Sequence, residues 1–410
     1  MYPKSLLCWT ALASLATARS LPKRNGPAPL MLAADEHRVS GMYIVKMRDE
    51  FVAADADRTL AAHISSSKHV YSATSFKGFA GALNATSLES LRANPHVDYV
   101  QEDSKFYLND YVTQENAPYG IARISHRNNG DTNYVRDDSD GDGTCVYVID
   151  TGINVDHPDF GGRASWGANF ADDEDVDGAG HGTYVAGIVG SESYGVAKKT
   201  QLLAVKVFKN DGTTEGNDII AAIDWVAQDA PTRDCPKGTV ANLSLGGGKN
   251  QASNDAVAAL VNAGTFVAVA SGNDNADAED FSPASEPSAC TVSASDENDA
   301  KADFSNYGAA VDIWAPGTNI ESTSYEGGST TASGTSASSP IVAGLGAYLL
   351  TLEGGRDPIA LCDRIKELST QGILAGVPDG TANALAFNGN PSDEAWAVLY
   401  VLYNMIYNGY

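Results

Sequence analysis

Three short segments of the chain carry side chains that could act together in nucleophilic catalysis. Asp150 ends the apolar run 146–149, and a glycine turns the chain two residues later. His181 lies between two glycines ahead of an apolar stretch, and Ser336 stands just before another such stretch. A serine hydroxyl is a weak nucleophile until an imidazole takes its proton, and a carboxylate orients that imidazole and stabilises its charged form. The three segments therefore contain the parts needed for acyl transfer.

Each segment also has an ordinary structural explanation. An aspartate at a strand end is usually a turn residue, a serine at a helix start is usually a cap, and a single histidine is usually structural. A non-catalytic binding protein on the same fold is one alternative, but it would lack at least one of Asp150, His181, Asn273 and Ser336, and all four are present. An esterase that uses the same three reacting residues is the other alternative. An esterase would carry G-x-S-x-G around its nucleophile, whereas residues 334–338 read G-T-S-A-S. Pro340 is expected in the first turn of the following helix, where proline is tolerated.

Alternating apolar runs and amphipathic stretches predict the elements that position these residues. The expected strands are 146–149, 202–208, 240–245, 266–270 and 311–315, and the expected helices are 185–189, 218–230, 256–263 and 340–352. Buried strands alternating with helices indicate an α/β fold with a parallel sheet covered on both faces. Active sites in such sheets gather at the carboxyl ends of the strands. Asp150 is expected at that edge.

The N-terminal part has a different pattern. Lys4, the apolar run 6–15 and Ala16-Thr17-Ala18 are typical of a secretory signal, which predicts export. After a Pro-containing linker, a small α+β unit is expected, with strands at 42–47 and 97–101, helices at 51–66 and 87–94, and a hairpin at 70–83.

Charge and cysteine content narrow the class of protein. Residues 1–111 hold 12 basic and 11 acidic side chains, a net of +1, whereas the rest holds 15 and 41, a net of −26. An acidic body is repelled by nucleic acid and anionic membranes, and no run of eighteen apolar residues predicts a membrane span. Cys8 lies in the signal, so four cysteines remain for disulfides in an oxidising compartment, with three possible pairings.

Taken together, the segments resemble the subtilisin family, within it the proteinase K-like secreted enzymes of fungi. V-I-D-T-G-I (148–153), G-H-G-T-x-V-A-G (180–187) and G-T-S-A-S-S-P (334–340) match three signature blocks, and 244–248, 270–274 and 282–288 match further ones. The order Asp, His, Ser is that of subtilisin. The resemblance implies a signal at 1–18, a propeptide at 19–111 with an inhibitor-like domain at about 37–108, a catalytic domain at 112–388 and a C-terminal extension at 389–410.

The implied protein is a secreted serine endopeptidase of broad specificity, made as a self-processing zymogen.

 It is expected to act as a monomer on polypeptide substrates, with its own propeptide as intramolecular inhibitor and folding aid. No catalytic cofactor is implied. The acyl-transfer residues would be Asp150, His181 and Ser336, and Asn273 would donate a hydrogen bond to the oxyanion beside the backbone N–H of Ser336.

The resemblance also implies a substrate cleft of broad specificity. The walls of its main pocket would be Ser244, Leu245, Gly246, Ala270, Ser271 and Gly272, and the edge strand that pairs with an extended peptide would be Gly212, Thr213 and Thr214. Thr214 replaces a usual glycine. Other departures are Ala337, Tyr184 and Val185, and none of them removes a catalytic group.

Disulfides and a structural metal follow from the same resemblance. The implied pairs are Cys145–Cys235 and Cys290–Cys362, and the implied calcium site uses the carbonyls of Pro287 and Ala289 with the carboxylate of Asp312. A second calcium site of the branch is not expected, because Arg127 and Ile373 offer no side-chain oxygen there.

Several features remain as hypotheses. The propeptide is expected to be cut between Asn109 and Thr113, and a cut after Tyr111 would suit a preference for aromatic or large aliphatic residues. The acidic residues of 172–177 are interpreted as a solvated loop or as an acidic rim that favours basic substrates and raises the pKa of His181. Sequons begin at Asn84 and Asn242, the second in a buried strand. The tail 390–410 has helical spacing and no assigned role.

Overall fold

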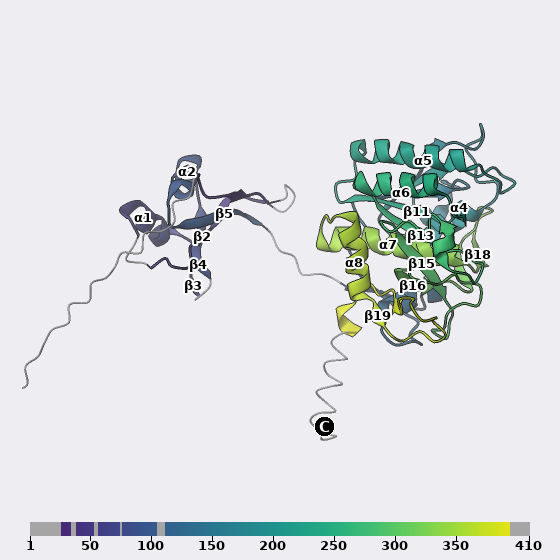
Figure 1. Ribbon diagram of the computed structural model, residues 1–410. Coiled ribbons are helices and arrows are strands. Elements are labelled where there is room, and N and C mark those ends of the chain that lie inside the picture. Colours follow the sequence, from purple (N-terminus) through teal and green to yellow (C-terminus); the bar gives the residue numbers. More distant parts are fainter. Residues whose placement is uncertain (1–25, 34–37, 53–55, 74–75, 105–110, 394–410) are drawn as a thin grey trace, which may run out of the picture. The chain divides into compact units, whose positions relative to one another are not determined.

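A computed structural model describes residues 26–33, 38–52, 56–73, 76–104 and 111–393 (Figure 1). The chain divides into two compact units, Met1–Leu108 and Asn109–Tyr410. The expected signal at 1–18 and most of the tail at 389–410 lie outside the described residues.

The first unit is a five-stranded sheet with two helices. Its strands lie in the order β1-β5-β2-β4-β3 and its core includes Val45, Leu60, Phe79 and Val100. The elements are β1 Leu30–Met31, β2 Arg38–Met47, α1 Arg58–Ser66, β3 His69–Ala73, β4 Phe76–Ala82, α2 Ala85–Ala93 and β5 Val97–Ser104. The hairpin predicted at 70–83 is confirmed, because β3 and β4 pair antiparallel.

The first helix is shorter than the sequence predicted. The expected helix 51–66 begins only at Arg58, because Asp57 is its N-cap and accepts a 2.8 Å hydrogen bond from the Leu60 N–H. Phe51 instead lies in the core of this unit.

The second unit is built on a nine-stranded sheet in the order β19-β20-β16-β15-β13-β11-β8-β10-β9. Neighbouring strands are parallel except for the pair β19–β20. The sheet strands are β8 Thr144–Asp150, β9 Ala164–Asn169, β10 Gln201–Lys206, β11 Gly238–Leu243, β13 Phe266–Ala270, β15 Cys290–Ser295, β16 Ile313–Pro316, β19 Thr370–Gln371 and β20 Ala384–Leu385. The predicted parallel α/β sheet is therefore confirmed.

Helices and short two-stranded sheets complete this unit. The helices are α3 Tyr119–Ala122, α4 His181–Gly190, α5 Gly216–Asp229, α6 Gln251–Asn262, α7 Thr335–Glu353 and α8 Pro358–Leu368. The remaining strands are β6 Tyr111–Gln114 with β7 Tyr134–Asp137, β12 Gly247–Gly248 with β14 Phe281–Ser282, and β17 Ile320–Thr323 with β18 Ser329–Ala332.

Alternation along β8 explains why helices cover both faces of the sheet. Tyr147 and Ile149 belong to the core cluster that includes residues of α5 and α6, which lie side by side (Figure 1). Val146 and Val148 belong to the cluster that includes residues of α4, α7 and α8. Successive strand residues point to opposite faces, so a continuous apolar run fits a strand buried on both sides.

Three sequence predictions about this unit are corrected. β15 was not expected, because its sequence C-T-V-S-A-S is half polar, yet it is wholly buried, and the hydroxyl of Ser293 donates to the Asn306 carbonyl at 2.8 Å. The helix expected at 340–352 begins at Thr335, which places Pro340 inside α7 and not in its first turn. The strand expected at 202–208 is β10, which ends earlier, at Lys206. The strand expected at 311–315 is β16, which begins later, at Ile313.

Among the described helices, α7 is the one long and apolar enough to cross a membrane, and 83% of it is buried. It packs against α4, β11, β13 and β15. Helix α7 is thus the central core helix of the unit.

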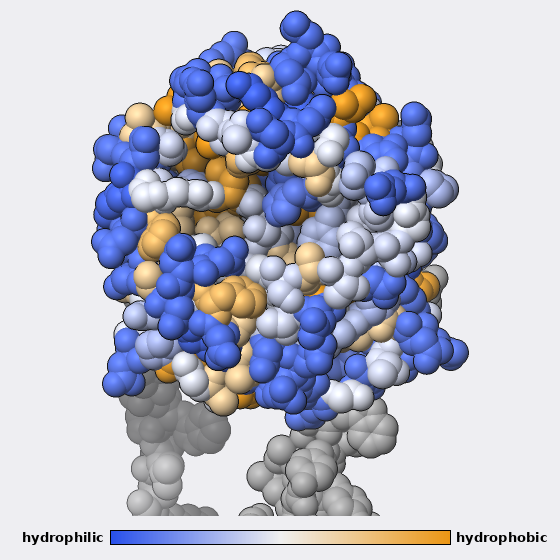
Figure 2. All heavy atoms as spheres, turned by 90° about the vertical axis from the view of Figure 1, so that its right-hand side faces the viewer, coloured by the Kyte–Doolittle hydropathy of each residue, from blue (hydrophilic) through white to orange (hydrophobic). Residues whose placement is uncertain are grey.

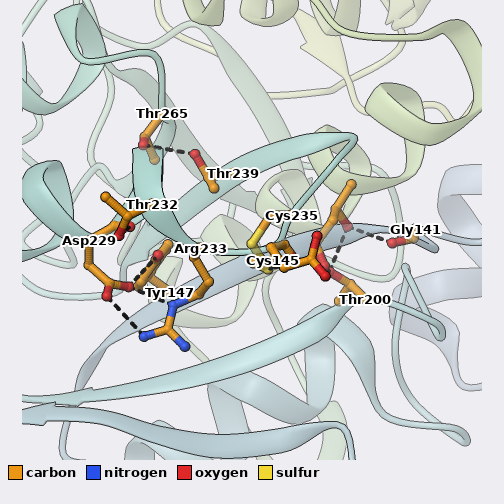
Figure 3. Close-up of a disulfide and its surroundings, with 12 residues drawn as sticks. Gly141, Cys145, Tyr147, Thr200, Asp229, Thr232, Arg233, Cys235, Thr239 and Thr265 are labelled. Atoms are coloured by element: carbon orange, nitrogen blue, oxygen red, sulfur yellow. Dashed lines mark hydrogen bonds and ion pairs between the residues drawn. A yellow bond between two sulfur atoms is a disulfide. The ribbon is translucent and has the colours of Figure 1, made fainter. Parts of the chain in front are cut away.

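Two disulfides cross-link the second unit, and their pairing is the one that the resemblance implied. Cys145 of β8 bonds to Cys235, 90 residues away, and Cys290 of β15 bonds to Cys362 of α8, 72 residues away. Figure 3 shows the first bond beside Asp229, which accepts hydrogen bonds from Tyr147 at 2.7 Å and from the Arg233 guanidinium at 2.6 Å.

Candidate active site

The fold brings Asp150 and His181 into direct contact. Asp150 is the last residue of β8, His181 is the first residue of α4, and the imidazole Nδ1 lies 2.8 and 2.9 Å from the two carboxylate oxygens. Asp150 is fully buried and also accepts a 2.7 Å hydrogen bond from the Thr151 N–H. The Asp150 charge raises the pKa of His181, burial opposes this, and Asp177 adds to the rise. The carboxylate therefore fixes the tautomer that leaves Nε2 as the base.

Asp177 does not belong to an exposed acidic rim. It is 6% exposed, and Oδ1 accepts hydrogen bonds from Thr151 Oγ1 and the Gly180 N–H, both at 2.7 Å. Its Oδ2 accepts from the N–H and hydroxyl of Thr183 at 2.8 and 2.6 Å. The carboxylate therefore ties the residue after Asp150 to both flanks of His181. In the sequence, the only sign of this role is an aspartate four residues before the histidine.

The other acidic residues of the loop behave differently. Asp173, Glu174 and Asp175 are exposed, whereas Asp172 lies 3.6 Å from the ammonium of Lys206, which is fully buried. Lys206 pairs with Asp150 in the β10–β8 register and donates to the Thr151 carbonyl at 3.1 Å.

Ser336 lies in the first turn of α7, beside the same pocket. The pocket of about 590 Å³ is lined by Asp150, His181, Asn273 and Ser336. The Ser336 hydroxyl donates to the Ser244 carbonyl at 3.3 Å, so it must turn away from that carbonyl to give its proton to His181. Hydrogen bonds of this kind often align only when substrate binds.

Asn273 is held so that its amide nitrogen remains for the pocket. Its Oδ1 accepts hydrogen bonds from the Thr335 N–H at 2.8 Å and from the Thr335 hydroxyl at 2.9 Å. The oxygen end of the side chain is therefore committed to the start of α7. The opposite end carries the donor nitrogen, and Asn273 lines the same pocket as Ser336. Its role as the oxyanion donor stays a prediction.

Both predicted pocket walls line this pocket. Its lining includes Ser244, Leu245, Gly246, Ala270, Ser271 and Gly272, together with Gly212. Gly272 has φ of +108°, and a Cβ there would meet the Asn306 side chain, so glycine is required beside Asn273.

The predicted pairing of residues 212–214 with an extended peptide stays a prediction. The Gly212 N–H donates to the Lys209 carbonyl at 2.9 Å, and the Lys209 N–H donates to the Thr213 carbonyl at 2.9 Å, so the segment closes a tight turn. Thr214 lines a second pocket of about 180 Å³ with Ile219, Leu243 and other residues of that face.

Of the expected calcium ligands, Asp312 lies beside the second disulfide. Asp312 Oδ2 accepts a 2.9 Å hydrogen bond from the Thr291 N–H, and its Oδ1 lies 3.2 Å from the Lys366 ammonium. The sulfurs of Cys290 and Cys362 are close to this carboxylate, but they are bonded to each other. The donor set is therefore oxygen only, which suits a hard cation, and an ammonium already neutralises its charged member.

Figure 2 shows one face of the second unit, on which most atoms belong to hydrophilic residues and hydrophobic ones gather in small patches, several of them within hollows.

Comparisons with known proteins agree with this site. The Subtilase family model matches residues 141–365, and the Peptidase inhibitor I9 model matches residues 42–109. The chain is 49% identical to the cuticle-degrading protease of Metarhizium anisopliae over 92% of this chain and 97% of the relative. It is 46% identical to proteinase R of Parengyodontium album over 90% and 94%.

The match extends to solved structures. A cold adapted subtilisin-like serine proteinase superposes with a TM-score of 0.64 and 40% identity, covering 67% of this chain and 99% of that protein. The chain therefore belongs to the subtilase family of serine proteases and carries an I9 inhibitor domain ahead of its protease domain.

Proposed function

We propose that the protein is a secreted, self-processing endopeptidase with Asp150, His181 and Ser336 as its catalytic triad. The observation that carries this proposal is the pair of hydrogen bonds between His181 and Asp150 at the edge of a pocket that Ser336 and Asn273 also line. A protein that only binds peptides would need none of this alignment.

The reaction follows from these groups. The Ser336 hydroxyl gives its proton to His181 Nε2 while its oxygen bonds to the substrate carbonyl carbon, and the carbonyl π electrons move onto oxygen. Asn273 and the Ser336 N–H stabilise that oxyanion. His181 then protonates the leaving amine as the C–N bond breaks, and water hydrolyses the acyl-enzyme by the same steps. Each step is served by these side chains, so no catalytic cofactor is needed.

The two pockets support a preference for aromatic or large aliphatic residues. Glycines and small residues leave the main pocket open, and Leu245 adds an apolar wall. A cut after Tyr111 would place Leu108 three residues earlier, and the smaller pocket lined by Ile219, Ile223 and Leu243 suits such a side chain. Main-chain binding would leave the remaining substrate positions permissive.

The processing site has a structural requirement. Tyr111 and Val112 are the first residues of β6 and pair with Asp137 and Arg136 of β7. Tyr111 lines a different pocket, with Arg127 and Leu349, and neither Tyr111 nor Val112 lines the active-site pocket. The cut would therefore be made while these two residues are unpaired. Strand β6 would then form, or re-form, after cleavage.

A structural calcium ion is proposed at Asp312, with the carbonyls of Pro287 and Ala289. A partly buried carboxylate and carbonyl oxygens are the ligands that calcium prefers. The ion would have to displace the ammonium of Lys366, which lies 3.2 Å from the carboxylate.

Export and glycosylation are supported by the sequence and by local structure. Residues 1–18 have the pattern of a secretory signal. Of the two sequons, Asn84 is exposed and caps α2, whereas Asn242 is fully buried. Glycosylation is therefore proposed at Asn84 alone, on a protein that acts as a monomer.

The test compares secreted wild type with Ser336→Ala. We expect wild type to mature near residue 112 and to cleave peptides with Phe or Tyr before the cut, and the variant to stay at zymogen length without activity. Ser338→Ala is the matched control, because this buried hydroxyl of the same helix bonds to the Ala315 carbonyl.

Other outcomes would select the alternatives. If wild type and Ser336→Ala mature alike and neither hydrolyses peptides, the binding-protein interpretation replaces this one. If esters are cleaved while peptides of the same side chains are not, the protein is an esterase.

A further inference from the structure

The proposed nucleophile lies at a gap in the hydrogen bonding of its own helix. In an α-helix the carbonyl of residue i accepts from the N–H of residue i+4. For Ser336 that residue is Pro340, which lies inside α7 and has no N–H. The Ser336 carbonyl therefore needs a donor from outside the helix.

Ser244 supplies that donor. Its hydroxyl donates to the Ser336 carbonyl at 2.9 Å, and Ser244 is 5% exposed, directly after the end of β11. The Ser244 carbonyl also accepts from the Ser336 hydroxyl at 3.3 Å. Ser244 thus contacts both the main chain and the side chain of the nucleophile residue.

Two further buried residues fix the direction of the Ser244 hydroxyl. The Asn242 amide nitrogen donates to Ser244 Oγ at 2.9 Å, and the Asn242 oxygen accepts from the Ser339 hydroxyl at 2.8 Å. Asn242 and Ser339 are both fully buried. Because a hydroxyl has one hydrogen and the amide nitrogen only donates, the Ser244 hydrogen must point to the Ser336 carbonyl.

We propose that Asn242, Ser244 and Ser339 act as positioning residues that replace the helical hydrogen bond missing at Pro340. The chain of bonds runs from α7 to β11 and returns to α7 at Ser336, so it ties the first turns of the helix to the central sheet. Reaction rates fall steeply when reacting atoms shift by about 1 Å, which makes this tie relevant to turnover. The inference rests on the proposed role of Ser336 as nucleophile.

The test is a double-mutant cycle between Ser244→Ala and Pro340→Ala. Ser244→Ala removes the donor, and we expect kcat to fall about 10- to 100-fold with little change in KM. Pro340→Ala restores a backbone N–H that can reach the Ser336 carbonyl. In the double variant we therefore expect kcat to recover most of that loss.

Ser338→Ala is the matched control for loss of a buried hydroxyl in α7. Its partners are the carbonyls of Ala315 and Pro316, so its effect is expected to be the same with Pro340 or Ala at residue 340. If Ser244→Ala is not secreted, Ser244→Cys keeps the size of the side chain with a weak donor. We then expect an intermediate loss of kcat that Pro340→Ala again reverses.

Specific results would overturn the inference. Additive losses in the double variant, or a rise in KM at constant kcat, would mean that Ser244 is only a pocket wall. Failure of the proposed function gives a different pattern, because wild type itself would then hydrolyse no peptide and Ser336→Ala would change nothing.

Discussion

Replacing Asp177 by asparagine should lower the stability of the protein by removing a hydrogen bond that holds the segments around His181. The Asp177 carboxylate accepts four hydrogen bonds, two on each oxygen, from Thr151, Gly180 and Thr183. An asparagine keeps one oxygen, but its amide nitrogen then faces the backbone N–H of Thr183 or of Gly180, and only the neighbouring threonine hydroxyl can accept from it. One charge-assisted bond from a buried backbone N–H is therefore lost, worth about 1.5–3 kcal/mol. The free energy of unfolding should fall by about 1.5–3 kcal/mol.

The stability assay uses Ser336→Ala as background, so that self-digestion does not contribute. Thermal or denaturant unfolding of Asp177→Asn is compared with Asp173→Asn, which removes the same charge from an exposed position of the same loop. The control should unfold like the parent. If the two variants are equally stable, the carboxylate does not brace the site as its contacts indicate.

The same change should also move the pH dependence of activity. Asp150 and Asp177 both raise the pKa of His181, so removing the Asp177 charge should lower it. Neutral imidazole is the base, so activity rises as pH passes this pKa, and the acidic limb of the kcat/KM profile should shift to lower pH. The stabilisation that comes from the raised pKa of His181 is fully present below the pKa of the unfolded chain. It is lost as the pH rises through the pKa of the folded protein. An acidic limb that does not move would refute the electrostatic part of the reasoning.

Three further changes test other parts of the structure. Replacing Cys290 and Cys362 by alanine opens a loop of 72 residues and should cost about 4 kcal/mol in unfolding free energy, measured by denaturant titration. Lys366→Met should increase the rise in Tm that added calcium produces, because the ion no longer competes with an ammonium, and an unchanged response would argue against the proposed site. Gly180→Ala should lower activity at least tenfold, because φ is +83° and a Cβ would meet the Tyr325 ring, and Tyr325→Ala in the same chain should return part of it.

Much of the fold could be predicted because it depends on local pattern. The run 146–149 within β8 is apolar at every position, as expected of a strand buried on both faces, and the next residue is Asp150. The order of Asp150, His181 and Ser336 and their flanking glycines predicted the chemistry. Strand β15 was not predicted, because its hydroxyl groups make the sequence look polar. In the structure, the hydroxyls of Thr291 and Ser293 donate to buried backbone carbonyls.

The family, the candidate reacting side chains and the parallel sheet could be predicted from the chain, because motifs and hydrophobic periodicity are carried by neighbouring residues. The contacts that hold those side chains depend on tertiary packing. The buried Asp177 carboxylate accepts hydrogen bonds from the segments around His181 and is not part of an exposed acidic loop. The Ser336 carbonyl accepts a hydrogen bond from Ser244, which is 92 residues away. Hydrogen-bond partners at such separations are set by how strands and helices pack, and a linear pattern contains no record of that distance.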